Sequence, residues 1–201
     1  RIPQASRDAF ARAIDRAQEW AVGMQSKNGG WAAFDADNEY YYLNQIPFSD
    51  HGALLDPPTA DVTARCVSML AQLGAKRGES KALDNAIAYL LSTQEQDGSW
   101  YGRWGVNYIY GTWSVLCAIG RAGIGRDHPM VARAVAWLGA IQNEDGGWGE
   151  SCDSYALDRK GHEPAPSTAS QTAWALLGLM SAGEAHTPAA HKILGGEPYH
   201  H

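Results

Sequence analysis

WLGAIQNEDGGW, residues 137–148, is the last of three copies of one pattern, and this repetition decides the fold. The earlier copies are WAVGMQSKNGGW at 20–31 and YLLSTQEQDGSW at 89–100. In each copy an aromatic residue is followed by Gln five positions later, and Trp follows that Gln after another six. Copies in register indicate a repeat architecture, in which each copy is one structural unit stacked on the next.

A helix is predicted upstream of each Gln. Apolar residues there, such as Ala13, Ala17 and Ala21, are spaced by three and four positions, which is typical of an amphipathic helix. The glycines that follow end the helix, because Gly readily adopts the left-handed cap conformation. Gln can then bond the loop backbone while the indole covers the turn. We therefore interpret six residues as structural staples between helix and loop: Gln25, Trp31, Gln94, Trp100, Gln142 and Trp148.

A second class of helix alternates with the first. These helices are predicted at about 61–73, 108–119 and 168–180, each after a turn-rich stretch, with Thr59 or Asp61 and Ser167 or Thr168 as N-caps. They carry apolar residues on more than one face, which indicates burial. Buried and amphipathic helices in alternation predict an all-α fold, an α/α toroid of which this chain supplies about three of six helical hairpins. The toroid is expected over 1–185, and an irregular tail over 186–201.

Composition excludes several classes of function. The chain has 201 residues, a hydrophobic content of 45% and a net charge of -6 without a basic cluster, which argues against a nucleic-acid surface. No stretch of about 20 apolar residues is present to span a bilayer. The three cysteines have no paired spacing, which favours free thiols in a reducing compartment.

Four segments carry a resemblance to a known family. They are QSKNGGWAAFD at 25–35, IPF at 46–48, DPPTADVTAR at 56–65 and GSWYGRWGVNYIYGT at 98–112. Together with the repeats they closely resemble the squalene–hopene cyclases, the bacterial relatives of the oxidosqualene cyclases, from about Ala9 to Glu184. In this resemblance the repeats are similar to the family's QW motifs, and the run containing Trp104 favours this family over other α/α toroids.

The resemblance implies an isomerase that converts squalene to hopene, hopanol and related pentacyclic products by a proton-initiated carbocation cascade. It implies no metal and no nucleotide cofactor. It also implies a monotopic enzyme on the cytosolic side of the bacterial cytoplasmic membrane, with squalene and the membrane surface as partners; a homodimer is compatible with it. This chain resembles the larger part of the catalytic barrel.

Cyclisation of this kind needs a dry general acid, a mould for a flexible polyene and electron-rich walls. Aromatic faces suit the last task, since a cation over a desolvated ring gains up to about 2 kcal/mol. By resemblance, Trp104, Phe34 and Phe48 are expected to bind substrate and stabilise cations. A lone Trp or Phe more often packs in a core, so it is the motif context that singles these three out.

The same resemblance assigns support of the proton donor to Asp61, Arg65 and Tyr110. Asp61 and Arg65 lie one turn apart at the start of a predicted buried helix. Some family members have His in place of Arg65; His can titrate, whereas Arg stays charged and can only hold or orient a carboxylate. Tyr110 matches a tyrosine that relays protons through water. Asp61 is also a candidate helix N-cap.

The proton donor itself is expected outside this chain. The family's Asp-x-Asp-Asp motif precedes the segment that residue 1 matches, and Asp35-Ala36-Asp37-Asn38 occupies a loop where the family has a non-catalytic run. We interpret that run as a loop-stabilising turn. Without the acid, the chain alone is expected to be inactive.

Three alternatives stay open at this point. A protein prenyltransferase β-subunit would share the toroid and need zinc, for which Cys152, Asp153 and His162 are candidates without a recognised ligand spacing. A carbohydrate-active α/α toroid would need two carboxylates across a cleft, and Asp35, Asp37 and Asp56 could supply them. A third reading is a non-enzymatic piece of a cyclase. An enclosed apolar pocket would favour the cyclase and an open polar cleft the carbohydrate enzyme.

Overall fold

The computed structural model describes residues 3–46, 54–156 and 161–184. Its α-helices are α1 (Gln4–Gly23), α2 (Ala60–Gln72), α3 (Lys81–Ser92), α4 (Asn107–Arg121), α5 (Pro129–Ala140) and α6 (Ala169–Ser181). Among these residues, two short 3-10 helices, η1 (Tyr41–Gln45) and η3 (Cys152–Tyr155), lie in the connections. Extended pairing within the described residues is limited to two isolated bridges, Asn38 with Asp56 and Glu150 with Pro164.

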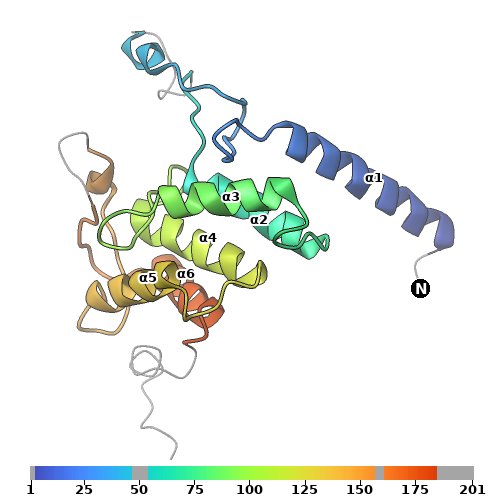
Figure 1. Ribbon diagram of the computed structural model, residues 1–201. Helices are drawn as coiled ribbons and strands as arrows, with labels where there is room; N and C mark the ends of the chain where they lie inside the picture. The colour runs from blue at the N-terminus through green and yellow to red at the C-terminus, as the bar shows by residue number, and fades with distance from the viewer. Residues whose placement is uncertain (1–2, 47–53, 157–160, 185–201) are drawn as a thin grey trace, which may run out of the picture.

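The helices form two layers. The inner layer is a row in which α4 lies between α2 and α6, and the outer layer places α3 against α2 and α5 against α4 and α6 (Figure 1). Inner and outer helices alternate along the chain, as the two classes of sequence pattern predict. The all-α architecture of an α/α toroid is therefore confirmed for this part of the ring.

The core lies between the two layers. Leu83, Ile87 and Leu90 of α3 and Val131 and Leu138 of α5 turn one face inward and are buried. Of the inner helices, α4 is buried on the widest surface, with ten residues: Asn107, Tyr108, Ile109, Gly111, Thr112, Ser114, Val115, Leu116, Ala118 and Ile119. Its burial matches the apolar residues that it carries on more than one face. The helix expected at 168–180 differs, because α6 leaves Leu177 and Met180 exposed on the inner face.

Each repeated Gln–Trp turn ties one outer helix to its neighbours. The indole N–H of Trp31, Trp100 and Trp148 donates to the carbonyl ten residues upstream, at 2.6, 2.8 and 2.8 Å. The amide of Gln94 donates to Gly98 O within the turn and to Met130 O in α5, both at 2.9 Å. The turn glycines Gly29, Gly98 and Gly146 have φ of 92°, 102° and 87°, the left-handed region that Gly adopts without strain.

The glutamine of the first copy makes the same two hydrogen bonds, and the glutamine of the third copy makes the same bond within its turn. Gln25 donates to Gly29 O at 2.8 Å and to Ala82 O of α3 at 2.9 Å. Gln142 donates to Gly146 O at 2.7 Å. In the first two copies the glutamine therefore joins the end of one outer helix to the first turn of the next.

A threonine on each inner helix completes the turn. The hydroxyls of Thr63, Thr112 and Thr172 accept from the backbone N–H of Trp31, Trp100 and Trp148, at 2.9, 3.0 and 3.0 Å. Thr63 and Thr112 are fully buried. The repeat thus fixes outer helix, loop and following inner helix together, which sets the position of the loops at the N-terminal ends of the inner helices.

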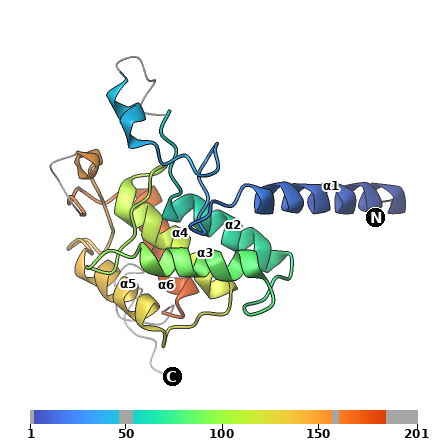
Figure 2. The ribbon, with the colours of Figure 1, turned by 45° about the horizontal axis from the view of Figure 1, so that its top comes forward.

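Helix α1 differs from the other outer helices. It projects away from the two layers in both views and buries none of its residues (Figures 1 and 2). Trp20 is 68% exposed, although the residues in register with it, Tyr89 and Trp137, are buried. The described inner helices pack against α3 and α5, so none of them covers the apolar face of α1.

Candidate functional site

Asp61 joins the first turn of α2 to the loop that carries Trp104. The side chain is 1% exposed. One carboxylate oxygen accepts from the Thr59 hydroxyl at 2.5 Å, and the other accepts from the backbone N–H of Trp104 at 3.0 Å. Thr59 is the N-cap residue of α2 but makes no capping bond with its side chain. Two residues that lie 43 positions apart in the sequence, and that both belong to the predicted site, are thus in direct contact.

Trp104 and Phe34 form an aromatic pair above this loop. Their ring centres lie 5.6 Å apart and their planes are nearly perpendicular, an edge-to-face contact. Trp104 is 46% exposed and Phe34 is 63% exposed. The guanidinium of Arg103 lies 5.5 Å from the Trp104 ring centre and also donates to Leu55 O at 2.7 Å. The loop that carries Trp104 is therefore hydrogen-bonded to the segment before α2, through Arg103 and Leu55.

Asp56 fixes the backbone beneath Phe34. Its carboxylate is 1% exposed and accepts from the N–H groups of Ala33, Phe34 and Asp35 at 3.2, 2.6 and 2.9 Å. A carboxylate that accepts hydrogen bonds from several backbone N–H groups at once holds a loop rigidly. Sequence reasoning considered Asp56 only as a carbohydrate-site acid and missed this positioning of Phe34.

Arg65 points to a different group of residues from Asp61. Asp61 and Arg65 form no ion pair with each other in the structure. The Arg65 guanidinium lies 4.6 Å from the ring centre of Trp113 and 6.0 Å from that of Tyr110. The structure therefore brings Arg65 and Tyr110 together, and separately brings Asp61 and Trp104 together.

Two tryptophans that sequence reasoning missed complete the group around Arg65. Trp113 and Trp174 stack at 5.7 Å with an interplanar angle of 14° across α4 and α6. Tyr110 lies 5.5 Å from Trp113 and 5.1 Å from Trp174. The signal that could have found Trp113 is its spacing: three positions after Tyr110, it lies on the same helix face.

Phe48 falls outside the described residues, so its role stays a prediction from the resemblance.

The three acids considered for a carbohydrate site bond to groups of their own loops instead. Asp35 accepts from the side-chain amide of Asn38 at 2.8 Å. Asp37 forms an ion pair with the Lys27 side chain at 3.4 Å, and it accepts a hydrogen bond from the Lys27 backbone N–H at 2.8 Å. This hydrogen bond lowers the pKa of Asp37. Together with Asp56 they form the loop-stabilising arrangement that the sequence predicts for the run Asp35-Ala36-Asp37-Asn38.

A groove of about 540 Å³ opens beside the Arg65 group. It is lined by Arg65, Ser68, Gln72, Trp113, Cys117, Gly120, Arg121, Leu177 and Ser181. These residues come from α2, α4 and α6. This groove on the inner row of helices therefore carries both aromatic surface and two cations, Arg65 and Arg121.

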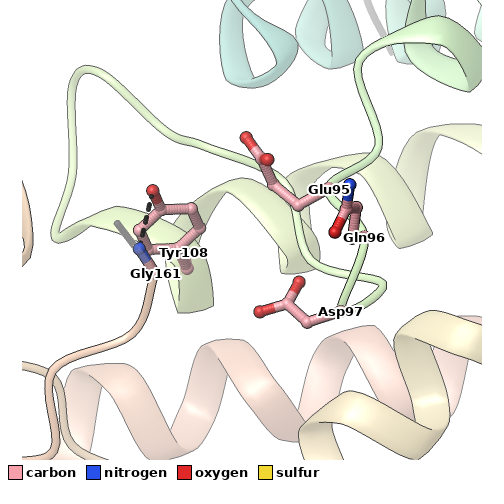
Figure 3. A pocket seen from close by; sticks show the side chains of 5 residues that line it. All are labelled: Glu95, Gln96, Asp97, Tyr108 and Gly161. Atoms are coloured by element: carbon pink, nitrogen blue, oxygen red, sulfur yellow. Dashed lines mark hydrogen bonds between the residues drawn. The ribbon is translucent and has the colours of Figure 1, made fainter. Parts of the chain in front are cut away.

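A second hollow, of about 670 Å³, lies away from the predicted site residues (Figure 3). Glu95, Gln96 and Asp97 of the second turn line it, together with Tyr108 and Gly161. The Tyr108 hydroxyl accepts from Gly161 N–H at 3.2 Å, and burial raises the pKa of Tyr108. Asp97 accepts from the Ser99 N–H and hydroxyl at 2.9 and 2.6 Å, so this acid serves the turn itself.

Neither a metal site nor a membrane span is found in the described part of the chain. No cluster of three or more His, Cys, Asp or Glu side chains in residues 3–46, 54–156 and 161–184 could hold a metal ion. Within the same ranges no helix is both long and apolar enough to cross a bilayer. The zinc ligands that a prenyltransferase subunit requires thus have no counterpart in these residues.

Comparison with known proteins gives a consistent result. The family model described as "Squalene-hopene cyclase C-terminal domain" matches residues 1–195. The squalene–hopene cyclase of Zymomonas mobilis is 66% identical over 186 residues, covering 92% of this chain and 28% of that protein. The squalene–hopene cyclase of Bradyrhizobium diazoefficiens is 68% identical over 180 residues, covering 90% of this chain and 27% of that protein. The chain thus spans little more than a quarter of the length of these relatives.

Among solved structures, the chain resembles an ent-copalyl diphosphate synthase from Streptomyces platensis. The TM-score is 0.54 at 19% identity, covering 90% of this chain and 39% of that one. At this identity the likeness shows the α-helical fold alone.

Proposed function

Because the chain belongs to the squalene–hopene cyclase family, we propose that it forms the larger part of the catalytic barrel of a triterpene cyclase. The complete enzyme converts squalene to hopene-type pentacyclic products through protonation and a carbocation cascade. It works on one leaflet of the bacterial cytoplasmic membrane, where its insoluble substrate dissolves, and it needs no metal or nucleotide.

One observation carries this proposal: the carboxylate of Asp61 holds the backbone of Trp104, whose ring meets Phe34 edge to face. An exposed indole surface is thereby fixed beside the N-terminal end of an inner helix. Such a surface stabilises a developing cation through its π-face without offering a lone pair that would capture it. The same surface helps to fold the polyene before reaction, so that ordering takes place on binding.

Asp61 supports the acid rather than acting as the acid. Both of its oxygens already accept hydrogen bonds, from Thr59 and from Trp104. A carboxylate held in this way positions the loop and keeps its charge away from the cations that it would otherwise quench. Arg65 stays charged and orients the donor carboxylate, and Tyr110 beside it relays protons.

A chimera tests the proposal. In the Zymomonas mobilis relative, residues 9–184 of this chain replace the matching segment, and the lipids formed from squalene are identified by mass spectrometry. We expect pentacyclic products. A chimera that is folded by circular dichroism and leaves squalene unconverted would contradict the proposal.

Asp61→Asn in this chimera tests the site. The substitution keeps the shape and one acceptor oxygen but removes the charge. We expect initiation to fall by at least about tenfold, which is less than the roughly 10²–10⁴-fold contribution of a general acid itself, because Asp61 only supports the acid. Asp84→Asn, in the first turn of the outer helix α3, is the matched control and should leave conversion unchanged. Equal squalene consumption by both variants would remove Asp61 from the acid network.

A further inference from the structure

The inner face of the row carries a stack of rings that no step proposed above employs. Trp113 of α4 and Trp174 of α6 lie nearly parallel, 5.7 Å apart, and are here called the indole stack. Tyr110 closes one side of it. The Arg65 guanidinium lies 4.6 Å from the Trp113 ring centre, close enough for a cation–π contact.

Trp113 is held for its ring face rather than for its N–H. The indole nitrogen is buried and has no hydrogen-bond partner within the described residues. A buried N–H without a partner is unfavourable, and buried Trp usually finds one. The position of the ring is instead set by its contacts with Trp174, Tyr110 and Arg65.

Arg65 depends on this surface. Its side chain is exposed, and no carboxylate of residues 3–46, 54–156 or 161–184 forms an ion pair with it. A long arginine side chain in that situation samples many rotamers, and stacking on an aromatic face restricts them. The stacked guanidinium still keeps its edge N–H groups free to donate in plane.

We propose that Trp113 and Trp174 are positioning residues, which hold the Arg65 guanidinium so that its N–H fork meets the carboxylate of the proton donor. This proposal rests on the proposed function above. It also explains why an arginine at position 65 lies against the indole stack. A shorter side chain such as His has fewer torsions to restrain and gains less from one.

A double-mutant cycle in the chimera tests the coupling. Trp113→Leu should lower kcat for squalene about tenfold and change KM less than about twofold, because a positioning residue acts on the chemical step. In an Arg65→Gln background the same change should lower kcat less than about twofold, since there is no guanidinium left to position. Trp113→Phe, which keeps a ring face, should restore most of kcat, and Trp174→Leu should act like Trp113→Leu but more weakly.

Trp137→Leu is the matched control. Trp137 is a buried indole of the outer helix α5 and does not contact Arg65, so its effect should multiply with that of Arg65→Gln. Equal effects of Trp113→Leu in the two backgrounds, or a Phe variant as poor as the Leu variant, would overturn the positioning role. If the unsubstituted chimera is folded and inactive, the proposed function fails and this proposal fails with it.

Discussion

At the scale of single residues, Trp104 combines two properties that a cation-stabilising side chain needs. Its backbone is fixed by a buried carboxylate, and its ring remains open to a ligand. A Trp placed for packing, such as Trp100, also has a fixed backbone, but its ring is fully buried. The ring is therefore the part of this residue that substitutions should probe.

We expect Trp104→Ala in the chimera to release monocyclic or bicyclic products at the cost of pentacyclic ones. The lost ring contact amounts to about 2 kcal/mol at most, or about thirtyfold in the competition between further cyclisation and early deprotonation. Gas chromatography with mass spectrometry measures the product ratio. Trp104→Phe retains a π-face and should keep mostly pentacyclic products; a normal product profile for the Ala variant would refute the role.

Glu150 provides a pH-dependent test at the same scale. Its buried carboxylate accepts from the N–H groups of Tyr108 and Ile109 at 3.1 and 2.9 Å, at the start of α4. Burial raises the pKa of Glu150, although these two bonds and the nearby His162 act in the opposite direction. The folded chain therefore holds this proton more tightly than the unfolded chain does.

A raised pKa contributes stability below the ordinary glutamate value, and this contribution is lost as pH rises through the raised value. The stability advantage of wild type over Glu150→Gln should thus be largest near pH 4 and narrow toward pH 7. Urea unfolding of the chimera at both pH values measures it. Glu144→Gln, at an exposed glutamate of the third Gln–Trp turn, controls for the loss of one negative charge. If the difference in the free energy of unfolding between wild type and Glu150→Gln increases with pH, the pKa of Glu150 is not raised in the folded chain.

The sequence predicts which residues belong to the candidate site, but not which of them are in contact. The candidates Asp61, Trp104 and Phe34 could be named from motifs, but their contact depends on loops that only the fold brings together. Helical spacing placed Asp61 and Arg65 one turn apart, yet their side chains serve different partners. Spacing defines a helix face and does not say which neighbour covers it.

At the scale of elements, the inner helices are predictable to within one or two residues. The expected range 108–119 corresponds to α4 at Asn107–Arg121, and Thr168 caps α6 through Gln171 N–H. Apolar periodicity and glycine stops are local properties, so they can be read without the fold. The threonines of the Gln–Trp turns could not be read, because their distance from the Trp differs in each repeat.

These threonines give a prediction for the element scale. Thr112→Val in the chimera keeps the shape but leaves the buried N–H of Trp100 without its acceptor, which should cost about 1–3 kcal/mol. Thr112→Ser restores the hydroxyl and should recover most of the loss. Chemical unfolding followed by circular dichroism measures both variants. Equal stability of Val and Ser variants would show that the turn does not need this bond.

At the scale of the whole molecule, the described helices form a row with an inner face that is not enclosed. The Arg65 group and the Trp104 pair both lie on inner helices or at their N-terminal ends. The chain covers 28% of the Zymomonas mobilis relative, so most of that protein's length is available to enclose this face. The expectation that the chain alone does not turn over squalene follows from this, because a cation cascade requires a site from which water is excluded.

The apolar face of α1 gives the last prediction, which compares one substitution in two settings. Trp20 is exposed here, while Tyr89 and Trp137 in the same register are buried and contact Pro58 and His162. Exposed apolar surface of this kind marks a contact with another part of a protein. We therefore expect α1 to be covered in the complete enzyme by the rest of the barrel.

Trp20→Ala should leave the thermal unfolding of the isolated chain unchanged and destabilise the chimera by about 3–5 kcal/mol, as a buried indole does. Trp137→Ala should destabilise both, because its ring is already buried in the isolated chain. Circular dichroism against temperature compares the four variants. If Trp20→Ala leaves the thermal unfolding of the chimera unchanged, α1 stays uncovered in the complete enzyme. In that case the first repeat shares the sequence pattern of the other two but not their packing.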